Sequence, residues 1–295
     1  MKLAQQFVPG KTNYSFEIFP PKRTDAVESV YHAIDELAPL KPDFISVTYG
    51  AGGNPANTFT VDIASDIKKR YGIESAAHLT CVNNSFEDID RILQRLKEKG
   101  VENILALRGD ENPDVPPKND FKYAKDLIAY IRGHGDFGIS AACYPEGHIG
   151  CESIDKDIEH LKEKVDAGAE HLISQLFFDN ETYYRFEEKV RRAGISVPME
   201  AGIMPVTSIA SITRMVTLCG ASLPRKFTQM MQRYQNYPEA VRDAGIAYAV
   251  DQIVDLAAHG VDGIHLYTMN NPTVAKRITE AVESLVRPHR LGERG

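Results

Sequence analysis

Eight short apolar runs alternate with amphipathic stretches along the chain, and this alternation constrains the fold more than any other feature. Most of the runs are rich in β-branched or aromatic residues and are bounded by Gly, Pro or Asn, as strands are. Strand–helix alternation enforces parallel pairing, and eight such units can close into a barrel. The sequence therefore predicts an α/β fold, a (β/α)8 TIM barrel, with an open doubly wound sheet as the alternative. The expected strands are 14–19, 43–49, 74–80, 103–108, 137–144, 171–178, 197–203 and 262–268.

Helical patterns fill the segments between these runs. An apolar stripe at positions 27, 30, 34 and 37 predicts the first helix, with Asp25 as its cap, and Ser85 followed by Asp88 predicts a cap for the third. The seventh connection, 204–261, is about twice the usual length and is expected to hold extra helices, one of them near 239–259. A barrel of this kind accommodates the 295 residues as a single domain, 1–295.

Composition excludes several classes of function. The net charge is −7 and acidic and basic residues are interspersed, so we expect no nucleic-acid partner. No stretch approaches 18 consecutive apolar residues, so we expect no membrane insertion. The four cysteines form no CxxC pair, and the first ten residues lack the apolar core of a signal peptide. These features predict a cytoplasmic protein.

Polar side chains recur at the carboxyl ends of the predicted strands, where chemistry sits in a barrel of this kind. Any one of them could be a satisfied core residue or a solvent-facing residue. Polar residues at the ends of seven of the eight predicted strands are together hard to explain by structure alone, because burying polar groups costs free energy unless they are paired. The opposite strand ends offer only Asp43 and Glu74 as ionised groups. The polar residues at the carboxyl ends are Glu17, Thr48, Tyr49, His78, Arg108, Asp110, Tyr144, Gln175 and Tyr267.

Several weaker motifs carry less information. The segment GHGDFG (133–138) matches a dinucleotide pattern but follows a helix and precedes a strand, the reverse of the required order. GAGGN (50–54) is either a flexible loop or a backbone that lies close to a flat ligand. His148 and Cys151 lack a second ligand pair, so no metal site is expected. Asp157 and Lys164 share one face of the fifth helical segment and are either solvated charges or ligand contacts.

The chain resembles the methylenetetrahydrofolate reductase family, bacterial type and catalytic domain only. The matching segments span roughly positions 14 to 271 in family order: FEIFPPK, VTYGAGG, HLTC, LRGD, YPEGH, KVDAGA, QLFFD, GIMPV and LYTMN. The resemblance implies an FAD-containing barrel enzyme of one-carbon metabolism, such as methionine biosynthesis. It would reduce 5,10-methylenetetrahydrofolate to 5-methyltetrahydrofolate with NADH or NADPH as electron donor. A homo-oligomer is expected, and a partner subunit that delivers electrons is an alternative donor.

By motif match, the resemblance also implies residue roles. Glu17 would be the general acid that helps open the folate ring, and Asp110 would contact the pterin and tune the flavin. Gln175, Tyr267 and Asn271 would join Asp110 in binding the substrate. The residues that would contact the cofactor are Thr48, Tyr49, Ala51, His78, Arg108, Gly109, Asp110, Ala124, Tyr144, His148, Asp157 and Lys164.

The sequence departs from the family pattern near the expected folate tail. Asn271 stands where the family often has an arginine, and Ser211 and Met215 stand where folate contacts are common. Lys276 or Arg277 is a candidate for the missing positive charge. Two other readings remain open: another flavin barrel, resembling proline dehydrogenase, or a flavin electron-transfer subunit of a larger complex.

Overall fold

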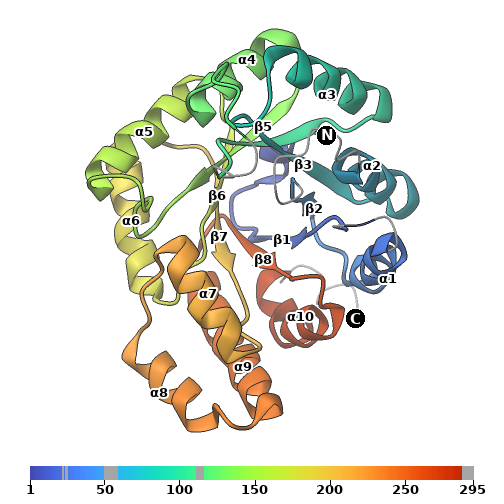
Figure 1. Ribbon diagram of the computed structural model, residues 1–295. Helices are drawn as coiled ribbons and strands as arrows, with labels where there is room; N and C mark the ends of the chain where they lie inside the picture. Colours follow the sequence, from blue (N-terminus) through green and yellow to red (C-terminus); the bar gives the residue numbers. More distant parts are fainter. Residues whose placement is uncertain (22, 24–25, 50–58, 111–115, 288–295) are drawn as a thin grey trace. The chain divides into compact units, whose positions relative to one another are not determined.

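The computed structural model describes residues 1–21, 23, 26–49, 59–110 and 116–287. Eight strands form a closed barrel in the order β1 to β8, and Figure 1 labels most of them. This result confirms the predicted fold class and excludes the open sheet. Each strand overlaps the apolar run that predicted it. The strands are β1 Asn13–Ile18, β2 Phe44–Val47, β3 Glu74–Thr80, β4 Asn103–Leu107, β5 Gly138–Cys143, β6 His171–Ser174, β7 Met199–Ile203 and β8 Gly263–Tyr267.

Helices follow the strands, and the long connection between β7 and β8 holds three of them. The third, α9, matches the helix predicted near 239–259 to within one residue. The α-helices are α1 Val27–Leu37, α2 Phe59–Tyr71, α3 Phe86–Lys99, α4 Ala124–His134, α5 Ile154–Asp166, α6 Asn180–Arg192, α7 Ile209–Cys219, α8 Arg225–Tyr234, α9 Pro238–His259 and α10 Pro272–Val286.

The chain divides into two compact units. The first comprises Met1–Gln6, Ser15–Ala142 and Glu163–Leu172, and the second comprises Phe7–Tyr14, Cys143–Lys162 and Ile173–Gly295. A single domain over 1–295 stays a prediction from the sequence. Among the described residues, no helix is long and apolar enough to cross a membrane.

In the first unit, strands β1 to β4 pair in parallel (Figure 1). Helix α2 packs against β3 and α3, and α4 packs against β4 and α3. Ser85 and Asp88 form the predicted capping box at the start of α3, and Gly100 ends that helix in the left-handed conformation. Helix α1 begins after Ala26 without a side-chain cap; Asp25, its predicted cap, lies outside the described residues.

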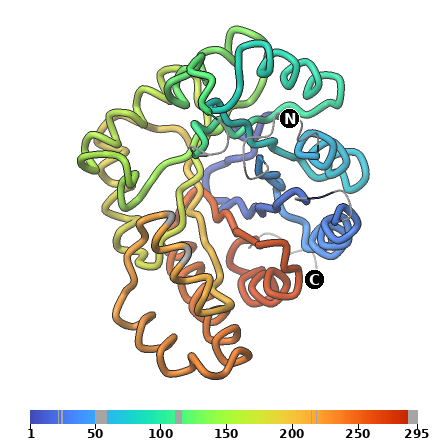
Figure 2. Tube along the Cα trace, in the orientation of Figure 1, coloured from blue at the N-terminus to red at the C-terminus, as the bar shows by residue number. Residues whose placement is uncertain are grey.

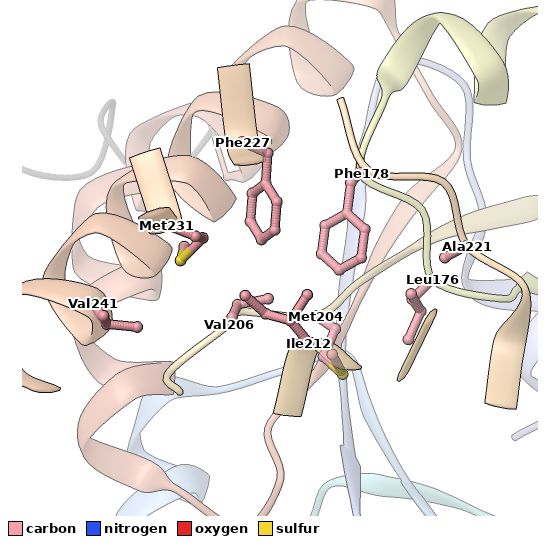
Figure 3. Close-up of a cluster of buried hydrophobic side chains, with 9 residues drawn as sticks. All are labelled: Leu176, Phe178, Met204, Val206, Ile212, Ala221, Phe227, Met231 and Val241. Carbon is pink, nitrogen blue, oxygen red and sulfur yellow. The ribbon is translucent and has the colours of Figure 1, made fainter. Parts of the chain in front are cut away.

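In the second unit, α9 contacts α6, α8, α10 and β7. The orange part of the trace in Figure 2 follows α7, α8 and α9 along the connection between β7 and β8. Figure 3 shows the apolar cluster that fixes α7 and α8 to this unit. At its centre, the Phe178 and Phe227 rings stack with centroids 4.7 Å apart. The buried members of the cluster are Leu176, Phe178, Met204, Val206, Ile212, Ala221, Phe227, Met231 and Val241.

Candidate active site

Glu17 occupies the fifth position of β1, and its two neighbours explain why an acid can stand there. Phe16 and Ile18 are completely buried on one face, so the alternation of a strand turns Glu17 to the other face. There, Glu17 Oε2 lies 3.5 Å from Nε2 of His78 on β3, and both side chains are more than nine-tenths buried. The sequence predicted both residues separately, and the structure brings them together.

Thr48 directly follows β2 and links three elements of the first unit. Its N–H donates to the Ile18 carbonyl over 3.0 Å, and its carbonyl accepts a hydrogen bond of 2.9 Å from the Thr60 hydroxyl in α2. Thr48 is buried, so these bonds hold the start of the loop after β2 against β1. Ala51, a predicted cofactor contact in this loop, lies outside the described residues.

Tyr49 is held by a residue that the sequence analysis did not identify. The Tyr49 hydroxyl lies 3.4 Å from Asn84 Nδ2, and the same amide nitrogen donates to the Thr80 carbonyl over 2.7 Å. Burial raises the pKa of Tyr49, and the hydrogen bond to Asn84 partly offsets that rise. The phenol therefore stays protonated near neutral pH, and the ring is fixed beside the end of β3.

The LRGD segment after β4 has a backbone that only glycine permits. Gly109 has a φ of 84°, and a Cβ atom there would lie 2.9 Å from Thr80 Cβ. The Arg108 carbonyl accepts from the N–H groups of Cys81 and Val82 over 3.1 and 2.9 Å. This packing brings the HLTC segment beside the LRGD segment.

Asp110 and Cys81 belong to the same two segments, LRGD and HLTC. Asp110 follows Gly109 and is exposed to solvent. Burial raises the pKa of Cys81 to about 12, so this thiol of the HLTC segment stays protonated.

Ala124 and Lys164 are two further predicted cofactor contacts in the first unit. Ala124 is the first residue of α4 and is buried. The Lys164 ammonium donates to the Ala142 carbonyl of β5 over 2.9 Å. The sequence analysis left Lys164 as either a solvated charge or a ligand contact, and a ligand contact stays a prediction.

The YPEGH segment of the second unit gathers three predicted cofactor contacts. The Tyr144 and His148 rings meet edge to face, with centroids 4.8 Å apart. The His148 N–H donates to Asp157 Oδ2 over 3.1 Å, which ties the loop to the first turn of α5. Asp157 is buried, so its carboxylate fixes this loop.

Gln175 and Tyr267 lie at the ends of β6 and β8 and are linked through Ser174. The Tyr267 hydroxyl donates to the Ser174 carbonyl over 2.7 Å, and Gln175 Oε1 accepts from the Leu176 N–H over 2.9 Å. The Tyr267 ring covers Gly202 of β7, where an added Cβ would lie 2.8 Å from the ring. A glycine at this position is therefore required for the placement of Tyr267.

Asn271, the departure from the family pattern, is the N-cap of α10. Its Oδ1 accepts from the Val274 N–H over 3.2 Å, and Pro272 is the first helical residue. Arg277 Nη1 lies 2.6 Å from Asp243, and Lys276 Nζ lies 4.0 Å from Glu280. Both candidates for a replacement charge therefore have acidic neighbours on the protein itself.

A buried acid in the second unit was missed by the sequence analysis, which assigned only Asp43 and Glu74 to the opposite strand ends. Glu200, the second residue of β7, is completely buried, and its Oε2 lies 3.9 Å from Nδ1 of His265 on β8. The signal was present, because Glu200 stands inside an apolar run as Glu17 does. Within the described residues, no group of three or more His, Cys, Asp or Glu could hold a metal ion.

Comparisons with known proteins agree with the motifs. The family model described as methylenetetrahydrofolate reductase matches residues 2–283. The 5,10-methylenetetrahydrofolate reductase of Pectobacterium carotovorum is 40% identical over 269 residues, covering 91% of this chain and 89% of that protein. The Arabidopsis thaliana protein named methylenetetrahydrofolate reductase (NADH) 1 is 38% identical over 276 residues, covering 88% of this chain and 46% of that protein. The chain thus spans about half the length of the plant relative.

A search of solved structures supports the fold. An uncharacterized protein from Clostridium thermocellum that binds two copies of 5-methyl-5,6,7,8-tetrahydrofolic acid has a TM-score of 0.67 at 14% identity. The match covers 94% of this chain and 95% of that one, and at this identity it shows the fold alone. The family model and the relatives confirm the resemblance that the motifs indicated: the chain belongs to the methylenetetrahydrofolate reductase family.

Proposed function

We propose that this chain reduces 5,10-methylenetetrahydrofolate to 5-methyltetrahydrofolate, with FAD as its cofactor and Glu17 as its general acid. The observation that carries the proposal is the buried carboxyl group of Glu17 near the carboxyl end of β1, with His78 as its neighbour. Active sites of barrel enzymes lie at this end of the strands. The proposed reaction rests on family membership, and the proposed general acid rests on the position of Glu17.

The reaction needs a proton donor that is shielded from water. Opening the five-membered ring of the substrate leaves a nitrogen that must take a proton, and a positioned carboxyl group can deliver it. Glu17 is only 7% exposed, so bulk water does not compete freely with the substrate for its proton. The neighbouring backbone is hydrogen-bonded through Thr48, which keeps the acid in place.

The described residues fit a flavin nucleotide in chemical character. In the first unit, Tyr49 offers a ring, Arg108 a cation, and Gly109 a backbone without a side chain. In the second unit, the edge-to-face rings of Tyr144 and His148 form an aromatic surface beside the start of α5. When bound, the flavin would accept a hydride from the donor and pass it to the substrate, and the protein would position both.

The folate would be bound by polar groups whose orientation the protein already fixes. Asp110 is exposed and offers a carboxylate that can stabilise a developing cation on the pterin. Gln175 and Tyr267 are oriented by their bonds to backbone groups. Asn271 would contribute through the first turn of α10, whose N–H groups favour an anion.

NADH is the donor that we propose, with NADPH as the alternative, because the plant relatives carry NADH in their names. We further propose that the protein forms a homo-oligomer and serves methionine biosynthesis in the cytoplasm. Delivery of electrons by a partner subunit is the alternative to direct use of the nicotinamide donor.

The Glu17→Gln variant tests the proposal. Glutamine keeps the shape of the side chain but cannot donate a carboxyl proton. We expect reduction of the bound flavin by NADH to stay near normal, while its reoxidation by methylenetetrahydrofolate falls by roughly 10²–10⁴-fold. Anaerobic stopped-flow absorption of the flavin measures the two steps separately.

Glu74→Gln is the matched control. Glu74 is a mostly buried acid of the same unit, but it lies at the start of β3 and pairs with Lys68. We expect both half-reactions to be unchanged in this variant. If Glu17→Gln slows the two half-reactions equally, Glu17 has a structural role. If methylenetetrahydrofolate does not reoxidise the flavin of the unmodified protein, the proposed activity is refuted.

A further inference from the structure

Glu17 Oε2 lies 3.5 Å from His78 Nε2, and the pair is built into the barrel wall. The two residues stand on β1 and β3, with β2 between them, and the register places Glu17 opposite Ser46 of β2 and Ser46 opposite Ala76. His78 lies two residues beyond Ala76 on the same face of β3. The 3.5 Å between the carboxylate and imidazole atoms is therefore set by strand register.

A glutamate that acts as a general acid must hold its proton near neutral pH until the substrate takes it. A glutamate side chain in water has a pKa of about 4.3 and at pH 7 carries a proton for only about 0.2% of the time. A histidine has a pKa of about 6.5 and is protonated for roughly a quarter of the time under the same conditions. An imidazole beside the acid can therefore hold a proton that an isolated carboxyl group would lose.

Burial determines how two such groups share one proton. The charge-separated form, a carboxylate beside an imidazolium, must be stabilised without solvent, and this carries a desolvation cost. The neutral form, with the proton on the carboxyl group, avoids that cost. In a buried pair at this distance, the protonation of one group therefore depends on the other.

We propose that His78 is the positioning residue through which Glu17 regains and holds the proton that it gives to the folate. This inference rests on the proposed role of Glu17. In each turnover, the Glu17 carboxyl group gives its proton to the ring nitrogen of the substrate and becomes a carboxylate. The neutral His78 imidazole then takes one proton from solvent and passes it to that carboxylate, which restores the starting state of the pair. The net change is one proton consumed, as the reduction requires.

Other titratable groups stand at the ends of the neighbouring strands. Among the described residues of the first unit, they include Tyr49 after β2, Cys81 after β3, and Arg108 and Asp110 after β4. Tyr49 stays neutral because its pKa is raised by burial. Arg108 carries a guanidinium group, which offers only hydrogen-bond donors. Asp110 is exposed, so its carboxyl group can also contribute to the pH dependence of activity. The experiment must therefore observe the protonation of His78 directly.

The first test observes the proton directly in the purified full-length protein. Histidine labelled with ¹⁵N in its ring reports protonation by NMR, and the His78 signal is identified by its loss in His78→Asn. We expect Glu17→Gln to lower the midpoint of the His78 titration, with a three- to tenfold or larger change in its protonation constant. A His78 signal that behaves identically with and without the Glu17 carboxyl group overturns the proposal.

His171 is an internal control in the same spectra. It is buried in the same unit on β6, and its Nδ1 lies 2.9 Å from the Ser140 hydroxyl. Its titration should not respond to Glu17→Gln. If the His171 and His78 signals shift together, the change is global and the proposed pairing is overturned.

The second test uses the two half-reactions. In His78→Asn, reoxidation by methylenetetrahydrofolate should slow on the order of 10–10²-fold, and its pH midpoint should move to lower pH, because a lone carboxyl group then holds the proton. His171→Asn should leave that pH midpoint unchanged. A slower rate with an unmoved midpoint assigns His78 a purely structural role. If Glu17→Gln does not slow reoxidation, the proposed role of Glu17 as general acid is refuted instead. The NMR titration separates this outcome from a failure of the His78 proposal, because it reports the pairing of His78 with Glu17 without any turnover.

Discussion

Replacing Gly202 with alanine should destabilise the second unit, because β7 has no room for a methyl group there. An added Cβ would lie 2.3 Å from the Ser174 carbonyl oxygen and 2.8 Å from the Tyr267 hydroxyl, whereas real Cβ contacts are not closer than 3.0 Å. The nearest obstacle is backbone, which cannot rotate aside as a flexible side chain can. Either β6 must move away from β7, or the Tyr267 ring must leave its position.

The size of the effect follows from the bonds at this point. Ser174 accepts the Tyr267 hydroxyl over 2.7 Å, and its Oγ accepts the Gly202 N–H over 2.9 Å. Forcing a methyl group into a packed region costs about 1–3 kcal/mol, and a lost hydrogen bond adds about 1 kcal/mol. We therefore expect a loss of about 3 kcal/mol, or roughly 6–12 °C in Tm for a protein of this size.

Urea unfolding followed by circular dichroism measures this loss, and Gly133→Ala is the matched control. Gly133 lies in α4 with nothing within 4 Å of its added Cβ, so alanine there should stabilise the protein by about 0.5–1 kcal/mol. The two Gly→Ala changes thus have opposite predicted signs. An unfolding midpoint for Gly202→Ala equal to that of the unmodified protein would refute the steric argument.

Three further outcomes are expected. Asn271→Arg should lower stability by about 1 kcal/mol in thermal unfolding because the α10 cap is lost, whereas Asn271→Asp should keep the cap and the stability. The Lys68 ammonium lowers the pKa of Glu102 to about 2, so the contribution of this ion pair is complete above the ordinary glutamate pKa of about 4.3 and disappears as the pH falls toward 2. Lys68→Met should therefore flatten the loss of stability across that acidic range, and an unchanged slope would count against the pair. Phe227→Ala should cost about 3–5 kcal/mol in urea unfolding because the ring is fully buried against Phe178; a loss below 1 kcal/mol would mean that the cluster repacks.

The individual residues of the candidate site could be predicted from the sequence because strand ends are easy to locate. Glu17, His78 and Tyr49 each stand near the end of an apolar run, and a parallel barrel assigns such ends to its active face. Their pairing could not be predicted in the same way. The contact between Glu17 and His78 depends on the register of three strands, and one residue of slip would turn either side chain to the other face.

Three further contacts were not predicted from the sequence, each for a different physical reason. Asn271 was compared with an arginine of the family, although an Asn directly before a proline is itself a helix-start signal. Helix periodicity gives the direction in which the Lys164 side chain leaves the helix. It does not give the position of the ammonium group, which a long and flexible side chain carries to the Ala142 carbonyl. Asn84 lies outside any strand, so only the folded loop shows that it reaches Tyr49.

The three helices between β7 and β8 have a consequence for the order in which the chain folds. The paired residues Glu200 and Gly263 are 63 positions apart, whereas Ala76 and Asn103, paired between β3 and β4, are 27 apart. The longer loop costs about 0.7 kcal/mol more in closure entropy, and its own helices must form before it shortens. Distant parallel pairings of this kind are slow to form. We therefore expect the strand pair that carries Gly202 and Tyr267 to form after the pair of β3 and β4, which leaves the apolar surface of β7 uncovered for longer during folding.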